Sequence, residues 1–166
     1  TATISRNGDL IHKMYIEVAG TAAATTNNPG AAWITTVELE IGGQRIDRHS
    51  GKWMEVWSEL TVPNFDGCVQ AHAANDGVAV AATDARTKYQ QATGMGGVTA
   101  AAAVAKFDVP LMFWFCRNPG LALPLIALQY HEVKVVLNHT IANVFGAAPT
   151  NNLWVDYIYL DTDERR

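Results

Sequence analysis

The chain has 166 residues, 49% of them hydrophobic and 17% charged, and its net charge is −4 at pH 7. This length fits one domain that is large enough to bury most of its apolar surface. The charged fraction is below the roughly 25% of an average soluble protein. A surface so poor in charge indicates that part of it is covered by partners.

The distribution of charge disfavours binding to nucleic acid, and the length of the apolar stretches disfavours a membrane span. Lysines and arginines are scattered, and the one basic pair is Arg165-Arg166, whereas a groove for nucleic acid needs clustered cations. The apolar stretches are far shorter than the ~20 residues that span a bilayer. We therefore expect neither direct binding to nucleic acid nor a transmembrane segment.

The two cysteines, Cys68 and Cys116, are too few for a disulfide framework. Cys116 ends an apolar run and is expected to act as a small core hydrophobe, which fits folding in a reducing, intracellular compartment. The chain begins at Thr1 inside a strand-like segment and ends after the charged turn at residues 161–166. We expect it to be a piece of a longer protein.

Two β-prone segments open the chain, at residues 1–5 and 10–18. The Asn-Gly turn at residues 6–9 predicts that they form a hairpin. Alternation in the second segment places five residues on one face: Leu10, His12, Met14, Ile16 and Val18. Residues 20–32 are small, polar and rich in alanine, so they are expected to form a loop without a packing role.

A second hairpin follows at residues 33–47. Residues 33–41 alternate as a strand, and Gly42 and Gly43 separate them from residues 44–47. Two glycines supply the positive φ values of a tight type I′ turn. No P-loop pattern follows the glycine pair, which favours a structural turn over a phosphate-binding loop.

The spacing of the apolar residues changes to that of a helix at residues 50–60. Trp53, Trp57 and Leu60 recur at helical spacing, Ser50 is a good N-cap, and Pro63 stops the pattern. We expect a short amphipathic helix across the end of a sheet, in which Trp53 and Trp57 plug the core. Paired tryptophans also occur in carbohydrate-binding sites, but usually exposed on strands or loops.

Residues 64–105 carry the weakest pattern. A second short helix is predicted at residues 84–92, with Thr83 or Asp84 as its cap. The surrounding alanine-rich and glycine-rich sequence is expected to form exposed loops that tolerate change.

The stretch from residue 107 to residue 138 organises the predicted fold. Residues 109–116 form an apolar, aromatic run that predicts a strand buried on both faces. The turn residues Asn118, Pro119 and Gly120 follow, and then an apolar connector that Pro124 keeps from being a helix or a central strand.

The chain then returns to strand-like patterns. Residues 133–137 alternate as a strand with one wetter face, residues 140–152 read as a loop, and residues 153–160 form a final strand. The sequence therefore predicts six to eight strands, two short helices and long loops, and strands do not alternate with helices as they do in βαβ units. This pattern predicts an all-β fold, an antiparallel jelly-roll sandwich.

The sequence carries no catalytic, cofactor-binding or metal-binding constellation. Its five histidines lack a metal-ligand spacing, no nucleophile-elbow motif is present, and the acidic residues at the end of the chain lack the pattern of an EF-hand. We therefore expect neither an enzyme nor a cofactor. Asn138 begins a formal N-glycosylation sequon.

Four blocks of sequence resemble one known family. They read SRNGDLIHKMYIEV, VELEIGGQRID, FWFCRNPGLALPLIALQYHEVKV and LWVDYIYLDTDERR. In this order they are similar to the major capsid proteins of nucleocytoplasmic large DNA viruses, especially those of algal viruses. The alanine-rich loops between the blocks match nothing in the family.

The resemblance implies a structural protein. Subunits of the family contain two successive eight-stranded jelly rolls, and three subunits form a pseudo-hexagonal capsomer of an icosahedral shell around an internal membrane. This chain is similar to the first jelly roll only, without the initial strand and arm and without the second roll. The implied partners are copies of itself, neighbouring capsomers and minor capsid proteins. The implied location is the virion, after folding and assembly in the host cytoplasm.

Two other functions fit a jelly-roll or barrel architecture. A lectin-like carbohydrate-binding module needs exposed aromatic residues. Four of the five tryptophans occupy positions expected to be buried: Trp53, Trp57, Trp114 and Trp154. Trp33 is then the one tryptophan that could be exposed. A cupin-type enzyme needs histidines and a carboxylate that converge on a metal, which the histidine spacing disfavours.

Overall fold

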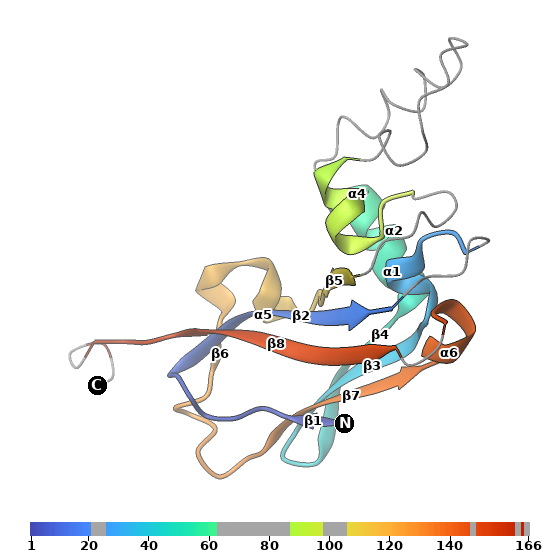
Figure 1. Ribbon diagram of the computed structural model, residues 1–166. Coiled ribbons are helices and arrows are strands. Elements are labelled where there is room, and N and C mark those ends of the chain that lie inside the picture. The colour runs from blue at the N-terminus through green and yellow to red at the C-terminus, as the bar shows by residue number, and fades with distance from the viewer. Residues whose placement is uncertain (21–25, 63–86, 98–105, 147–148, 162–163, 165–166) are drawn as a thin grey trace, which may run out of the picture.

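The computed structural model describes residues 1–20, 26–62, 87–97, 106–146, 149–161 and 164. Within these residues eight strands form two antiparallel sheets, which lie as two layers around one apolar core (Figure 1). The predicted antiparallel β-sandwich is confirmed.

Sheet A contains, in spatial order, β1 (Ala2–Thr3), β7 (Val133–His139), β3 (Ile34–Ile41) and β4 (Gln44–Ser50). β3 and β4 form a hairpin, and φ is 60° at Gly42 and 81° at Gly43. Gly42 must also be small, because a Cβ there would lie 2.8 Å from Nδ1 of His131.

Sheet B is organised around β2 (Leu10–Ala19), which pairs along its length with β8 (Thr150–Ile158). The other edge of β2 pairs with β5 (Lys106–Pro110) toward its C-terminal end and with β6 (Leu123–Pro124) at its N-terminal end. β2 is therefore the strand on which the other three depend.

The first two strands do not form the predicted hairpin. β1 pairs with β7 in sheet A, whereas β2 lies in sheet B. Gly8 packs so closely on β8 that a Cβ there would lie 2.6 Å from the Cβ of Tyr157. The turn at residues 6–9 is thus used to carry the chain from one sheet to the other.

A β-bulge in β2 interrupts the predicted alternation of its side chains. The register with β8 shifts between Ile11 and Lys13, and Ile11 is fully buried together with Met14, although alternation had placed them on opposite faces. An extra residue in one strand reverses the alternation that follows it. His12, predicted to share a face with Met14, is half-buried, and its Nδ1 lies 3.1 Å from the carbonyl oxygen of Phe115.

The apolar run at residues 109–116 is not one continuous strand. β5 ends at Pro110, and a short helix, α5, occupies Trp114–Arg117, followed by the 3-10 turn η1 at Pro119–Leu121. Phe113 and Phe115 are fully buried and stack at 5.8 Å between ring centroids. The Leu111 amide still donates to the carbonyl oxygen of Met14 in β2 at 2.9 Å, and the chain then leaves the sheet. The apolar character of the rest of the run reflects burial in the core and not strand pairing.

Helix α2 (Gly51–Thr61) confirms the predicted helix and its cap, since Ser50 Oγ accepts from the Trp53 amide at 3.1 Å. The prediction for its tryptophans is wrong. Trp53 is 41% exposed and Trp57 is half-buried, so neither is a core plug.

Close packing at Gly51 explains the rotation of α2. A Cβ at this position would lie 2.3 Å from the carbonyl oxygen of Ala31 and 2.4 Å from that of Ile34. The helix therefore buries the face of Gly51, Met54 and Ser58, and turns its tryptophan stripe away from the core.

The other helices are short. Helix α4 (Lys88–Thr93) begins at Thr87, which forms a capping box with Gln90, while residues 83–86 of the prediction lie outside the described part of the chain. Two segments predicted as loops contain α1 (Pro29–Ala32) and α6 (Ile141–Val144). The described residues thus hold more than the two predicted helices.

The described end of segment 20–32 also has a packing role, against expectation. Pro29, Gly30 and Ala31 are buried, and the Gly30 amide donates to the carbonyl oxygen of Gly94 at 3.0 Å. A Cβ on Gly30 would lie 1.8 Å from the carbonyl oxygen of Thr93. Only glycine allows α1 to approach the end of α4 this closely.

We expect Gly30→Ala to destabilise the fold by about 3 kcal/mol, because the added methyl group meets backbone and not a flexible side chain. Chemical denaturation gives the free energy of unfolding. Gly120→Ala is the matched control, since its Cβ would meet only Asn118 Oδ1 at 3.5 Å. Equal stability of the two variants would contradict this account of the α1–α4 contact.

Candidate assembly surfaces

The described residues hold no cluster of three or more histidine, cysteine or acidic side chains that could bind a metal. His49 is buried against Phe113, with 5.3 Å between ring centroids. Burial lowers the pKa of His49, although the carboxylate of Asp47 opposes this effect. His72 and Cys68 lie outside the described residues.

Cys116 is half-buried and packs against the core, as predicted. Burial raises the pKa of its thiol to about 11, so the reactive thiolate is scarce at neutral pH. Among the described residues no helix is long and apolar enough to cross a membrane. Within the described residues, the surface features that bear on association are a groove and three exposed patches.

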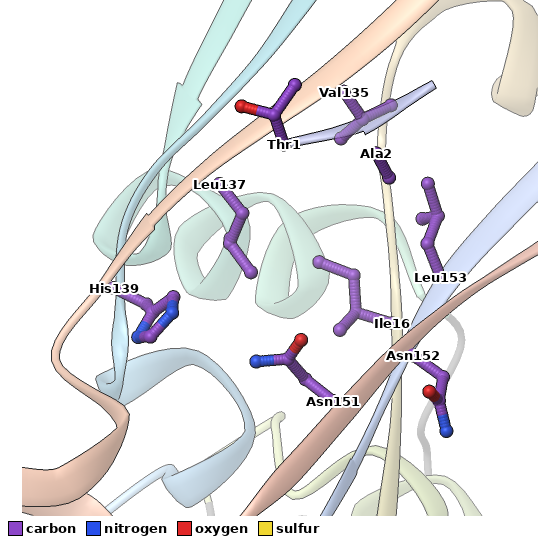
Figure 2. Close-up of a pocket in the computed structure, with 9 residues that line it drawn as sticks. All are labelled: Thr1, Ala2, Ile16, Val135, Leu137, His139, Asn151, Asn152 and Leu153. Atoms are coloured by element: carbon purple, nitrogen blue, oxygen red, sulfur yellow. The ribbon is translucent and has the colours of Figure 1, made fainter. Parts of the chain in front are cut away.

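The groove lies on the open side of the sandwich, between β7 of sheet A and β8 of sheet B, and has a volume of about 320 Å³. Figure 2 shows Leu137, Ile16 and Asn151 pointing into the space between these strands, with His139 beside it. Thr1 and Ala2 line the groove where β1 begins. We call this feature the open-edge groove.

Unpaired strand edges border the open-edge groove. β1 covers only the first part of β7, where the Ile4 amide donates to the carbonyl oxygen of Val133. Every second residue of a strand directs its backbone groups to the same edge, so Leu137 and His139 direct theirs to the uncovered part. The outer edge of β8 pairs with no strand among the described residues.

The first exposed patch is the outer face of sheet B. Tyr15 of β2 and Trp154 of β8 are direct cross-strand neighbours, and their rings are nearly parallel, with centroids 6.4 Å apart. Trp154 is 49% exposed. We call this surface the aromatic face.

A polar network holds the aromatic face in place. The Glu17 carboxylate lies 2.6 Å from Lys106 Nζ and accepts from Asn152 Nδ2 at 3.3 Å. The hydrogen bond from Lys106 is the main cause that lowers the pKa of Glu17. The Trp154 ring is thus stacked on Tyr15 beside this network, while much of it stays in solvent.

The second exposed patch is the stripe of α2 that faces away from the core. Trp53, Val56 and Leu60 are 41%, 44% and 77% exposed. The guanidinium of Arg117 lies 4.2 Å from the ring centroid of Trp57, a cation–π contact that links α5 to α2.

The third patch is a clamped loop at the opposite end of the sandwich. The Arg6 guanidinium donates to the carbonyl oxygens of Leu128 at 2.6 Å, His131 at 3.1 Å, and Gln129. Between these carbonyls Tyr130 is 94% exposed. Nearby in the sequence, Asn118 Oδ1 accepts from the Gly120 amide at 2.9 Å and closes the turn at Pro119.

The sequon residue Asn138 lies in β7 opposite Thr36, and its Nδ2 donates to Thr36 Oγ1 at 2.9 Å. The glycosylated nitrogen would be this same atom, so a glycan would replace the hydrogen bond. Glycosylation of Asn138 stays a prediction.

The exposure of the tryptophans reverses two expectations. Trp33 was expected to be the exposed tryptophan, but it is fully buried. Trp154 was expected to be buried, but it is 49% exposed. The alternation of Trp154 with Leu153 and Val155, both packed against the core, is the signal that could have placed it on the outer face.

Comparisons with known proteins agree with one another. Residues 1–161 match the family described as "Major capsid protein N-terminus". The chain is 46% identical to the major capsid protein of Pyramimonas orientalis virus, over 100% of this chain and 41% of the relative. It is 40% identical to the major capsid protein of Paramecium bursaria Chlorella virus 1, over 98% of this chain and 36% of the relative.

Solved structures show the same likeness. The crystal structure of PBCV-1 VP54, fitted into a reconstruction of the virophage Sputnik, matches with a TM-score of 0.72 and 39% identity over 98% of this chain and 38% of that chain. A quasi-atomic model of the PBCV-1 capsid matches with a TM-score of 0.71 and 38% identity, over the same shares of the two chains.

The two-sheet sandwich is therefore a jelly roll of the class found in viral shells. The chain belongs to the family of major capsid proteins of large DNA viruses, and it corresponds to the N-terminal part of that family. It spans about two fifths of the length of the curated relatives.

We expect Arg6→Ala to release the 128–131 loop, because three carbonyl oxygens lose their charged donor. Hydrogen exchange at the His131 amide, which donates to the carbonyl oxygen of Leu128 at 3.0 Å, should become at least tenfold faster. Arg45→Ala is the control, since Arg45 makes only an exposed ion pair with Glu38 at 3.7 Å. Unchanged exchange in the Arg6 variant would show that other contacts hold the loop.

Proposed function

We propose that this chain is the first jelly roll of a structural coat subunit, which self-associates into trimeric, pseudo-hexagonal capsomers of an icosahedral viral shell. The observation that carries the proposal is the match of residues 1–161 to the capsid family, with 46% and 40% identity to two major capsid proteins. Such a protein acts by burying surface against its neighbours and has no enzymatic role. Its place is the virion, after assembly in the host cytoplasm.

The exposed surface supports a role in association. Large apolar side chains are exposed on the aromatic face and on the clamped loop. Grouped exposed aromatic residues are typical of protein interfaces. Each contact is modest, and repetition by symmetry makes the closed shell stable. Neighbouring capsomers and minor capsid proteins are the partners that fit these surfaces.

We also propose that the whole protein adds a strand before Thr1 and a second jelly roll after residue 166. The open-edge groove supports the first addition, because β1 pairs only Ala2–Thr3 with a β7 that runs to His139. An extension of β1 in the same register would pair with Leu137 and His139 and cover the groove. The short span of the chain relative to its relatives supports the second addition.

A carbohydrate-binding function is the alternative that one observation favours. The exposed Trp154 stacks on the half-buried Tyr15 and has carboxylate and amide neighbours, which is the composition of a sugar platform. The family match weighs against this function as the main one. No observation favours the cupin reading.

The proposed function predicts a trimer when the chain is expressed with its native flanking sequence. Light scattering should give the mass of three subunits without added metal or sugar, and negative-stain electron microscopy should show pseudo-hexagonal particles. A stable monomer of the complete subunit at high concentration would contradict the proposal.

The strand before Thr1 has a separate test. In the 166-residue chain the Leu137 amide should exchange with solvent rapidly, because no strand covers it. With the native upstream residues present, the same amide should be protected at least tenfold. The Val135 amide, at a position where β7 already pairs with β1, serves as the internal control. Equal exchange at Leu137 in the two chains would rule out the extended β1.

A further inference from the structure

We propose that the aromatic face is a two-fold contact between two copies of this chain, in which the Tyr15–Trp154 rows of the copies pack on each other. This inference rests on the proposed self-association and names one surface that performs it. The two-fold is the symmetry of a contact between capsomers and is distinct from the three-fold axis within a capsomer.

The registers of sheet B define rows of side chains on this face. Tyr15 is paired with Trp154 on one side and Pro110 on the other, which makes one apolar row across three strands. Two residues further along β2, Glu17 is paired with Asn152 and Asp108. Two residues back, Lys13 is paired with Asp156. The polar rows therefore lie on either side of the apolar row, each about 7 Å away.

The apolar row is pre-arranged for contact. The Tyr15 and Trp154 rings are already stacked, with only 13° between their planes. Lys106 and Asn152 hold Glu17 on the same face, so little side-chain freedom remains to be lost on association. Tyrosine and tryptophan with a polar rim are the residues that dominate binding energy at protein interfaces.

Charge on the two polar rows specifies a second copy as the partner. Consider a two-fold axis that lies in the plane of the contact, runs perpendicular to the strands and passes through the Tyr15–Trp154 row. The strands of the second copy then run opposite to those of the first. This operation places Lys13 of each copy opposite Glu17 of the other, and Asp156 opposite Asn152. Lys13 is exposed and forms no ion pair among the described residues, so its charge is available to a partner. The face is therefore complementary to itself.

The α2 stripe provides matched controls, because it carries an exposed tryptophan, Trp53, and an exposed lysine, Lys52. Four variants are compared with the wild-type chain by sedimentation velocity over a wide concentration range. They are Trp154→Ala, Lys13→Glu, Trp53→Ala and Lys52→Glu. Thermal unfolding of each variant verifies that it is folded.

We expect Trp154→Ala and Lys13→Glu to weaken association at least tenfold, and Trp53→Ala and Lys52→Glu to change it less than threefold. High salt should weaken the wild-type contact, but it should strengthen the residual contact of the Lys13→Glu variant, because salt screens the repulsion between Glu17 and the carboxylate introduced opposite it. If the wild type associates and the Trp154 and Lys13 variants associate equally well, the aromatic face is not the contact, while self-association stands. If the wild type stays monomeric throughout, the two-fold contact and the proposed self-association of this chain both fail.

A sugar is the other occupant that this face could accept. Methyl α-mannoside and N-acetylglucosamine are therefore titrated against tryptophan fluorescence in the wild type and in Trp154→Ala. Absence of saturable quenching agrees with a protein contact. Saturable quenching that is lost in Trp154→Ala would overturn the proposal in favour of a carbohydrate platform.

Discussion

The pairing of β2 with β8 is the constraint on which the rest of the structure depends. It joins residues 10–19 to residues 150–158, so the chain must close on itself before sheet B exists. β5 and β6 then have only the other edge of β2 to pair with. Sheet A closes in the same way through β1 and β7. Both layers of the sandwich thus depend on contacts between distant parts of the sequence.

The order of the strands also explains why the aromatic face and the open strand edges are exposed. Because β2 is paired on both edges, its outer side chains stand in the middle of a sheet face, where Tyr15 meets Trp154. β8 has one free edge among the described residues, and β7 is covered only in part. The open edges and the aromatic face therefore follow from strand order, and they point to association with further strands or further copies.

Much of the fold could be predicted from sequence where a local pattern decides the outcome. The β3–β4 hairpin, the Ser50 cap and the alternation in β7 each depend on residues close together in the chain. The partner of β1 could not be predicted, because the turn at residues 6–9 is compatible with either a hairpin or a crossing between sheets. The bulge in β2 likewise depends on the register with β8, more than a hundred residues away.

The exposed residues were harder to predict than the buried ones. Helical spacing gave α2 an apolar stripe, but the backbone contact of Gly51 with Ala31 and Ile34 decides which face is buried. The family was recognisable from four blocks of sequence, whereas the aromatic face was not, because it arises only when β2 and β8 are paired. A local pattern therefore identifies the class of protein more readily than it identifies the surfaces with which the protein works.

The two ends of the sandwich differ in how the chain turns. At one end the turns are tight and contact one another. Arg6 donates to carbonyl oxygens of the 128–131 loop, and Gly42 packs against His131. At the other end lie α1, α2, α4 and α6 (Figure 1). Backbone contacts of Gly30 and Gly51 fix α1, α2 and α4 at this second end. Substitutions on the exposed sides of these helices can therefore change what a subunit displays there and leave the register of both sheets unchanged.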